Sequence, residues 1–564
     1  MKKSILLLVA LSMTVLQLNA QPKTKRARGK AQPMVNTAKS QMGYDQNPKL
    51  IVGLVVDQMR YDYLTRFWNR YGEGGFKRLV QEGFNAKNHH YNYAPTSTGP
   101  GHASVYTGAT PSIHGVIGNN WYSKAEGRWV YCAGDENYAS VGSTSNVGKM
   151  SPHRMLTTTM TDQLRLHTQQ RGKVIAIAIK DRGAVLPGGH SANAAYWFEG
   201  GKTGHWVSST YYMETLPKWV QDWNASDAVE QYKKEWNTVE PISTYAESGS
   251  DVNKYEGLIR GEADTSFPHK LDKYWEFNGQ FSLLRMTPYG NSMTMDFALE
   301  ALRQEQLGKD ADTDFLAVSF SSTDYVGHFF GANSKEIQDV YMRLDKDIER
   351  LLNTLDKEVG QGEYTLFLTA DHGAIHVPNY LKDQRIPAGY WDKEAFREKL
   401  DGYLTRQYGE AKVIEEISYN EVFLNHRVLD SLDLELDDVQ EELAMHLLSH
   451  DQIDKVFTGT QMWEQEYRSG LAAVFQNGWN QKRSGDVLFV GKPGYIDYPR
   501  TGSTHGSAMI YDTHVPLLFY GAGIKPGWTV ERTEIPDIAP TISSLMGMAF
   551  PNGCTGRPIS AVLR

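Results

Sequence analysis

The chain has 564 residues, of which 58 are Lys or Arg and 66 are Asp or Glu, so its formal net charge is −8 at pH 7. Hydrophobic residues make up 40%, aromatic residues 11% and charged residues 22% of the chain. These ordinary values argue against wholesale disorder, collagen-like repeats and a small disulfide-rich fold, and the mild acidity argues against a nucleic-acid binder with a strongly basic face.

Residues 1–20 predict a cleaved secretory signal peptide. They begin with Lys2 and Lys3, continue with a run rich in Leu, Ile and Val, and end with the small residue Ala20. An N-terminal anchor helix is the alternative. Residues 21–47 are rich in Lys, Arg, Gln, Pro and Ser and predict a flexible leader. No later apolar run reaches the roughly 18 residues of a membrane span, so we expect an exported mature protein without one.

The chain contains two cysteines, Cys132 and Cys554. They could form one bridge in an oxidising compartment, but their positions in the sequence do not establish the geometry that a disulfide needs. They form no zinc-ligand signature, so any metal must be held mainly by His and carboxylate side chains. Neither begins the Cys-x-Pro-x-Arg pattern from which sulfatases make formylglycine, which argues against a typical sulfatase.

Four continuous apolar runs, rich in β-branched residues and followed by polar loops, predict buried strands of an α/β fold. They are Leu50–Val56, Val174–Ile179, Phe315–Phe320 and Tyr364–Leu368. Between the third and fourth runs, apolar residues at helical spacing predict an amphipathic helix over residues 333–355, with Asn333 and Glu336 as its capping start. Strand, long helix and strand predict a parallel crossover, and ligands gather at the carboxyl ends of such strands.

Metal-ligand residue types stand at these carboxyl ends. Asp57 directly follows the first run, although an aspartate there is commonly a helix cap or a turn former. Asp324 and His328 follow the third run at a spacing of i,i+4, which can aim both side chains at one ion, and Asp371 and His372 follow the fourth. Carboxylate and imidazole ligands suit zinc, with manganese or iron as alternatives, and such sites can hold two ions about 3.5–4 Å apart.

Residues 94–107 (APTSTGPGHASVYT) place several hydroxyl groups among small residues, and Gly99 and Gly101 allow close backbone approach. The candidate nucleophiles are Thr96, Ser97, Thr98 and Ser104. Taken alone, this segment more often forms a turn that caps the next helix.

Seven separated segments resemble, in order and residue type, the alkaline phosphatase superfamily, and most closely its phosphate-irrepressible (PafA-type) group. The segments are VVDQMR, PTSTGPGH, SIHGVIGNNWY, KDR, STDYVGH, ADHGA and GSTHGS. The resemblance runs from about Pro48 to the C-terminus. It implies an α/β, alkaline-phosphatase-like sandwich with a central, mostly parallel sheet flanked by helices and with cap insertions, and it implies a periplasmic location.

The resemblance also implies the roles of individual residues. Thr98 would be the nucleophile, in place of the serine of the better-known enzymes, and a ligand of the first of two Zn²⁺ ions per chain. The other ligands of this ion would be Asp57, Asp371 and His372. The ligands of the second ion would be Asp324, His328 and His505. The side chains that contact the phosphoryl group would be Asn119, Lys180 and Arg182. Lys180 stands near where the better-known enzymes hold magnesium, so we expect no dedicated magnesium site.

Several of these residues have ordinary roles when taken alone. His505 would be an exposed polar residue of a loop, Asn119 and Asn120 would be turn formers, and the triplet at residues 180–182 would be a solvated loop. The resemblance alone makes them candidate site residues.

These residues imply a metal-dependent phosphomonoesterase that hydrolyses small-molecule phosphate monoesters through a phosphothreonine intermediate and releases inorganic phosphate. Two non-bridging oxygens held by Lys180, Arg182 and Asn119 would favour a monoester dianion over a diester. A phosphodiesterase or nucleotide pyrophosphatase of the same superfamily is the main alternative. An inactive phosphate- or glycan-binding relative is disfavoured by the complete ligand set. The signal peptide and Thr98 disfavour a phosphoglycerate mutase-like isomerase.

We expect residues 48–564 to form one catalytic domain with insertions near 190–290 and 380–500, since both insertions lie between residues of the same site. The aromatic residues within 196–236 would either pack a lid onto the sandwich, which is favoured, or form a wall over the leaving group. In the second insertion a helix is expected at Val439–His450 and a strand at Asp486–Val490. A further strand is expected after His505, at Val515–Tyr520.

Overall fold

The structure, a computed structural model, describes residues 47–409 and 412–564. The predicted signal peptide at 1–20 and the predicted leader at 21–47, except its last residue, lie outside the described residues. Within the described ranges, no helix is both long enough and apolar enough to span a bilayer.

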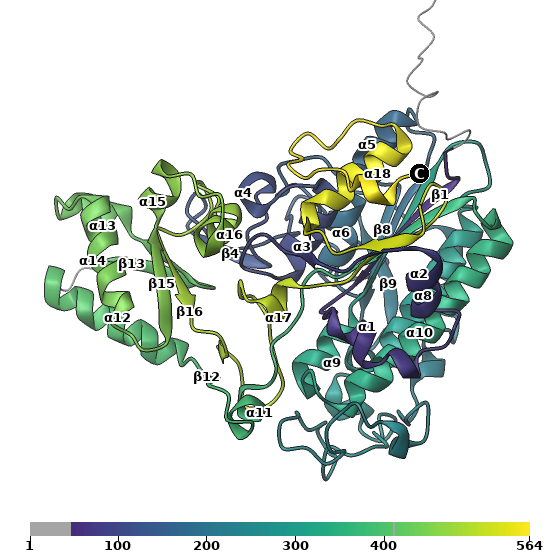
Figure 1. The fold of residues 1–564 in the computed structure, drawn as a ribbon, viewed down its shortest axis with the longest axis horizontal. Coiled ribbons are helices and arrows are strands. Elements are labelled where there is room, and N and C mark those ends of the chain that lie inside the picture. The colour runs from purple at the N-terminus through teal and green to yellow at the C-terminus, as the bar shows by residue number, and fades with distance from the viewer. Residues whose placement is uncertain (1–46, 410–411) are drawn as a thin grey trace, which may run out of the picture. The chain divides into compact units, whose positions relative to one another are not determined.

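A mixed sheet, ten-stranded over the described residues, forms the centre of the fold in the order β19-β2-β18-β11-β1-β10-β7-β8-β9-β6 (Figure 1). Its five middle strands are parallel. These are β11 (Tyr364–Thr369), β1 (Leu50–Val56), β10 (Asp314–Phe320), β7 (Val174–Ala178) and β8 (Ala194–Glu199). Every residue of β1, β10 and β11 is buried, which explains why these strands have continuous apolar sequences. The four predicted strands are confirmed, and β8 is an addition to them.

The outer strands are mostly antiparallel to their inner neighbours. On one side lie β18 (Leu517–Gly521), β2 (Phe84–Ala86) and β19 (Gly527–Thr529), and on the other β9 (His205–Ser209) and β6 (Ser140–Val141). β18 is the strand expected after His505. The central, mostly parallel sheet expected from the sequence is therefore confirmed.

Helices cover both faces of this sheet (Figure 1). One face carries α8 (Pro288–Gln304) and α10 (Lys335–Leu355), and the other carries α3 (Thr98–Thr107), α6 (Arg182–Gly188) and α18 (Ile538–Met546). α10 is the predicted amphipathic helix, but its N-cap is Ser334, whose Oγ accepts a hydrogen bond from the Ile337 amide at 3.1 Å. The prediction of Asn333 as the cap was wrong by one residue.

Shorter elements connect these layers. They are α1 (Asp62–Arg66), α2 (Phe76–Glu82), β3 (His89–His90), α4 (Pro111–His114), β4 (Asn120–Ser123), β5 (Arg128–Tyr131), α5 (Met160–His167), α7 (Lys218–Ala225), α9 (Ser322–Phe330), α11 (Pro378–Asp383), α17 (Ile510–Thr513) and β20 (Thr533–Glu534).

The aromatic residues within 196–236 pack into the core. The rings of Tyr196, Trp206 and Trp223 lie 5.6, 4.2 and 5.5 Å from the ring of Phe297 on α8. Trp206 stacks almost parallel to that ring, with an interplanar angle of 8°. For these residues the packing alternative is confirmed, and a wall over the leaving group must come from elsewhere.

Residues 389–496, called the cap below, form a second layer. At its neck β12 (Gly389–Tyr390) pairs in parallel with β17 (Tyr495–Ile496). Its sheet has the antiparallel order β13-β14-β16-β15. These strands are Ile414–Ser418, Glu421–Leu424, Val487–Gly491 and Ile453–Thr458 in that order. β16 corresponds to the strand expected at Asp486–Val490.

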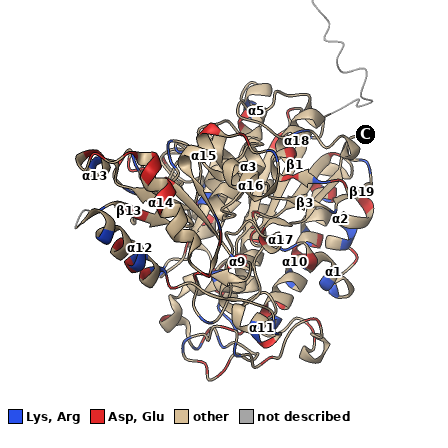
Figure 2. Ribbon diagram, turned by 60° about the vertical axis from the view of Figure 1, so that its left-hand side comes forward, with Lys and Arg blue, Asp and Glu red and all other residues tan. Residues whose placement is uncertain are grey.

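Five helices complete the cap among the described residues. They are α12 (Lys393–Tyr408), α13 (His426–Ser431), α14 (Leu436–Leu448), α15 (Gly459–Glu464) and α16 (Gly470–Gly478). Leu400 and Leu443 of α12 and α14 are buried in a core that the cap builds for itself, whereas charged residues lie on the outside of both helices (Figure 2). α14 is the helix expected at Val439–His450. The division into one catalytic domain with two insertions stays a prediction.

Cys132 and Cys554 are both free thiols. They lie at opposite ends of α3, because Cys132 Sγ is beside Gly99 and Cys554 Sγ is beside Gly108. The disulfide that the sequence left open is therefore absent from the described structure.

A buried histidine fastens the irregular segment after α7 to the start of α10. His269 Nδ1 lies 2.9 Å from Glu262 Oε2, and its Nε2 lies 3.2 Å from Glu336 Oε1. Burial favours the neutral ring, but the hydrogen bonds to the two carboxylates outweigh burial and raise the pKa of His269 from 6.5 to about 9. His269 is therefore an imidazolium at neutral pH.

This pair of contacts makes stability depend on pH. Because the folded-state pKa lies above the unfolded value, the contribution is complete below pH 6.5 and is lost as the pH rises through about 9. At most about 3 kcal/mol is at stake, from 1.36 kcal/mol per pKa unit. We predict that His269→Gln lowers the unfolding free energy at pH 6 and flattens its decline between pH 6.5 and 9.5 in urea titrations. Parallel pH profiles for the variant and the parent would contradict this.

Candidate active site

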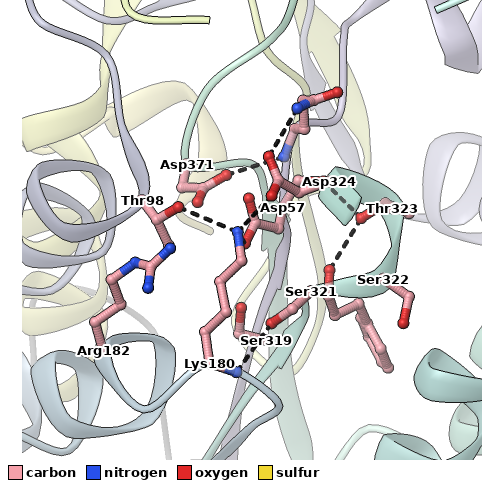
Figure 3. Close-up of polar contacts among 12 residues, drawn as sticks. Asp57, Thr98, Lys180, Arg182, Ser319, Ser321, Ser322, Thr323, Asp324 and Asp371 are labelled. Carbon is pink, nitrogen blue, oxygen red and sulfur yellow. Dashed lines mark hydrogen bonds and ion pairs between the residues drawn. The ribbon is translucent and has the colours of Figure 1, made fainter. Parts of the chain in front are cut away.

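The candidate site lies where the parallel strands end (Figure 3). Four of the five parallel strands deliver site residues, directly or on the next helix: Asp57 follows β1, Lys180 follows β7, Asp324 and His328 lie on α9 after β10, and Asp371 and His372 follow β11. Thr323 on α9 donates a hydrogen bond to the carbonyl of Asp57, which ties the helix to the end of β1.

Six of the seven predicted metal ligands form two triads. In the first triad, Asp57, Asp371 and His372 each offer a ligand atom, and these atoms lie within 4.8 Å of one another. In the second triad, Asp324, His328 and His505 do the same. These two triads coincide with the two ligand sets that the sequence predicted, apart from Thr98. All three residues of the first triad are fully buried.

The two triads are adjacent. The rings of His372 and His505, one from each triad, stack with centroids 3.4 Å apart and an interplanar angle of 13°. Gln58 bridges the triads, because its backbone amide donates to Asp371 Oδ1 at 3.1 Å and its side-chain Nε2 donates to Asp324 Oδ1 at 2.7 Å.

Each histidine is oriented by a backbone carbonyl. The Nδ1 atoms of His328, His372 and His505 donate to the carbonyls of Ser503, Gly373 and Thr96 at 2.8, 3.0 and 2.7 Å. This contact fixes the tautomer with the lone pair on Nε2, which is the usual arrangement of a metal-binding histidine. The Nε2 atoms of His328 and His505 lie 3.1 and 3.7 Å from Asp324 Oδ1.

The protonation states of His372 and His505 fit this arrangement, whereas the Asp324 carboxylate outweighs burial and raises the pKa of His328. Burial lowers the pKa of His372 to about 3, and burial together with the neighbouring His372 also lowers the pKa of His505, so both rings are neutral. Burial raises the pKa of Asp371 to about 6. Burial and the adjacent carboxylates of Asp324 and Asp371 raise the pKa of Asp57 well above its usual range. The site thus gathers negative charge that only nearby cations can stabilise.

One ammonium lies at the centre of these carboxylates. Lys180 Nζ is 2.7 Å from Asp57 Oδ2, 2.6 Å from Asp324 Oδ2 and 3.3 Å from Thr98 Oγ1 (Figure 3). Although burial opposes the charge, Asp324 and Asp57 raise the pKa of Lys180. The three buried aspartates together with one lysine leave an excess of negative charge.

Thr98 is the first residue of α3, with its hydroxyl at the positive end of the helix. α3 lies so close to the first triad that a Cβ on Gly101 would be only 2.4 Å from the carbonyl oxygen of Asp371. The predicted segment is therefore a helix that begins at Thr98. Thr96 and Ser104 are turned to other partners: Thr96 donates to the Ser507 carbonyl and Ser104 contacts His114.

Asn119 and Arg182 border the same place. Asn119 Oδ1 accepts a hydrogen bond from the Gly99 amide at 2.7 Å, which leaves its amide N–H groups as donors. Asn120 is exposed and begins β4. Arg182 begins α6, its side chain rises toward Thr98 (Figure 3), and its Nη1 donates to Tyr131 Oη at 3.1 Å. All ten predicted site residues thus lie around the end of the sheet.

Two further residues shape the site. Gln58 joins the triads, and its φ of +66° is unusual for a residue other than glycine. His102 Nδ1 donates to the Thr98 carbonyl at 2.9 Å and its Nε2 contacts Ser319 Oγ at 2.8 Å. Gln58 lies in the segment VVDQMR and His102 in PTSTGPGH. Their positions in these two motifs were the only sequence feature that could have identified them as site residues.

The residues fit divalent cations. Asp57 Oδ1, Asp371 Oδ2 and His372 Nε2 are buried and have no hydrogen-bond partner among the described residues. Orphaned buried acceptors of this kind cost free energy unless a cation or a donor satisfies them. Mixed carboxylate and imidazole sets suit zinc.

The sequence matches the family described as type I phosphodiesterase / nucleotide pyrophosphatase over residues 51–508. It is 46% identical to a protein named calcium-transporting ATPase from Myroides odoratus, over 92% of this chain and 95% of that one. It is 43% identical to alkaline phosphatase PafA from Elizabethkingia meningoseptica, over 92% of this chain and 94% of that one.

The fold is similar to the crystal structure of wild-type alkaline phosphatase PafA, with a TM-score of 0.88 at 42% identity, covering 92% of this chain and 99% of that one. A crystal structure of a mutant of that enzyme matches equally well. Its substitutions affect a threonine, an asparagine, a lysine and an arginine, in that order along the chain. These are the residue types, in the same order, of Thr98, Asn119, Lys180 and Arg182.

The bridge made by Gln58 gives a test of the two triads. We predict that Gln58→Ala, which removes the donor to Asp324 Oδ1, weakens zinc binding to the chelator-treated protein about 10- to 100-fold in calorimetric titrations, as loss of a group that orients a ligand typically does. Gln440→Ala is the matched control, because Gln440 is equally buried but lies in the cap. Equal zinc affinities for both variants and the parent would contradict this role.

Proposed function

The chain belongs to the type I phosphodiesterase / nucleotide pyrophosphatase family and is an alkaline phosphatase of the PafA type, and we propose that it hydrolyses phosphate monoesters with Thr98 as its nucleophile and two divalent cations as cofactors. The observation that carries this proposal is the position of the Thr98 hydroxyl. It lies at the N-terminus of α3, 3.3 Å from Lys180 Nζ, and α3 packs against the first triad.

We assign one Zn²⁺ to each triad. Asp57, Asp371 and His372 would hold the first ion together with Thr98, and the second triad would hold the other. When bound, the two cations would supply the positive charge that favours ionisation of a hydroxyl and that offsets charge on the departing oxygen. The orphaned acceptors of the first triad and the neutral rings of His372 and His505 support this assignment.

The reaction would proceed in two displacements. Thr98 Oγ1 attacks phosphorus, a P–O bond to Thr98 forms, and the bond from phosphorus to the alcohol oxygen breaks. The proton of the Thr98 hydroxyl passes to solvent and the departing oxygen takes one proton from solvent, so the alcohol leaves neutral and no net proton is consumed. The positive end of α3 and the Lys180 ammonium stabilise the charge on the phosphoryl oxygens during this step.

A water molecule completes the cycle. It attacks phosphorus of the phosphothreonine, and the bond from phosphorus to Thr98 Oγ1 breaks. One proton of the water restores the Thr98 hydroxyl, and inorganic phosphate leaves. The backbone contact from Gln58 to Asp371 and the contact from His102 to the Thr98 carbonyl keep the first triad and the nucleophile in register through both steps.

The phosphoryl contacts favour a monoester. Lys180, Arg182 and Asn119 offer donors to the non-bridging oxygens, and Arg182 can give two parallel N–H groups. A diester carries a second substituent where one of these donors would lie. These three donors therefore favour monoesterase activity over that of a phosphodiesterase or nucleotide pyrophosphatase, which remains the alternative activity.

The location and domain organisation are part of the proposal. Residues 1–20 support export, with the periplasm as the expected compartment. Residues 48–564 would act as one catalytic domain, since the segment near 190–290 contributes β8 and β9 to the main sheet and Tyr419 of the cap contacts Asn119.

Substitution of the phosphoryl-binding residues tests the preferred substrate. We predict that Lys180→Ala or Arg182→Ala lowers kcat/KM for an aryl phosphate monoester about 10²- to 10³-fold and that for the matching diester less than about tenfold, as loss of a buried charge-stabilising donor does in related chemistry. Lys218→Ala is the control, because this lysine is 80% exposed on α7. Equal losses on both substrates would contradict the assignment.

A further inference from the structure

A cavity of about 430 Å³ lies between the cap and the second triad. On the site side it is lined by Thr504, His505 and Gly506, and on the cap side by Tyr419, Trp391 and Tyr495. His505 belongs to the second triad. Because the first triad is assigned to the cation beside the Thr98 nucleophile, the cation of the second triad would offset charge on the departing oxygen. The cavity therefore begins where the alcohol part of a monoester leaves the phosphoryl site.

Two of the aromatic side chains that line this cavity are exposed and come from different parts of the fold. Trp129 on β5 is 43% exposed, and Tyr419 in the turn between β13 and β14 is 39% exposed. Trp129 Nε1 donates to Glu416 Oε2 of the cap at 3.0 Å. This contact holds the indole across the junction between the catalytic part and the cap.

The position of Tyr419 is maintained against backbone strain. Its φ of +51° lies in the left-handed region, which is unfavourable for a bulky residue. The ring lies against the backbone of Gly118, and its hydroxyl accepts a hydrogen bond from the Asn119 amide at 3.0 Å. Backbone strain that persists beside a site indicates function, and here it places the Tyr419 ring beside Gly118 and its hydroxyl on the Asn119 amide.

We propose that this cavity is a subsite for a planar aromatic leaving group, such as an aryl group or a nucleobase-bearing alcohol, with Trp129 and Tyr419 as its walls. Flat apolar groups gain free energy by leaving water and by stacking on aromatic faces, and binding pockets of this size combine such walls with a few polar groups. The inference rests on the proposed function, because it names the substrate class of the same site.

The test compares three monoesters, ethyl, phenyl and 2-naphthyl phosphate, by phosphate release. Phenol and naphthol are alcohols of similar acidity, so the naphthyl-to-phenyl ratio of kcat/KM reports contact with the extra ring. For Trp129→Ala we expect a loss of about tenfold for 2-naphthyl and about threefold for phenyl phosphate, and the smallest loss for ethyl phosphate, in line with the apolar area each leaving group would bury.

Two further variants separate the contributions. Trp463→Ala removes an indole that is 65% exposed on α15 and does not line the cavity, so it should preserve all three rates. Tyr419→Phe keeps the ring but removes the acceptor of the Asn119 amide. It should lower all three rates by a similar factor and keep the naphthyl-to-phenyl ratio.

Each outcome is decisive. A loss that grows with the size of the leaving group in Trp129→Ala, and not in Trp463→Ala, supports the subsite. Equal losses on the three substrates, or none, would overturn it and would mean that the leaving group points into solvent. Failure of the parent enzyme to hydrolyse any of the three would overturn the proposed function itself, which is a distinct result.

Discussion

The structure depends on one buried ion network at the carboxyl end of its sheet. Lys180 Nζ lies 2.7 Å from Asp57 and 2.6 Å from Asp324, with Asp371 close by, and all four groups are buried. Three carboxylates around one ammonium are unstable in a low-dielectric interior unless further cations join them. The excess of negative charge requires cations. Once the cations are bound, their positive charge would attract a phosphate dianion. Thr98 reaches this network at the positive end of a helix, so the proposed nucleophile and the proposed cations would act on the substrate through one electrostatic arrangement.

Much of this could be predicted from the sequence, because parallel strands converge at one edge. The strand ahead of Asp57 was predicted with its observed bounds, and the other predicted strands of the central sheet differ by one or two residues at their ends. The division of the ligands into two triads could be predicted only through the family resemblance, which rests on the order and type of the motif residues. Gln58 could not be assigned, because its partners Asp324 and Asp371 are hundreds of residues away and pattern analysis does not report such contacts. The helix cap at Ser334 was missed for a local reason: Asn and Ser are equally good caps, so composition alone did not choose between neighbours.

The extra length of the chain has two different uses. The aromatic residues after β8 pack around Phe297 and enlarge the core, whereas the cap builds its own sheet and its own core and brings Tyr419 to Asn119. A high density of aromatic residues in the sequence therefore did not show where the leaving group would bind, because packing in a core and stacking on a ligand use the same residue types. Exposure separates the two, because Trp129 remains 43% exposed within a cavity while Trp206 is fully buried.

The most direct test of this account counts the cations that the network needs. Protein stripped by a chelator and checked by mass spectrometry would be titrated with zinc while monoester hydrolysis is followed. We expect activity to be absent at the start and to reach its plateau at two equivalents of zinc per chain. We also expect Asp57→Asn and Asp324→Asn each to bind one equivalent fewer. Full activity of the stripped protein, or a plateau unaffected by either substitution, would contradict the claim that these buried carboxylates hold the catalytic cations.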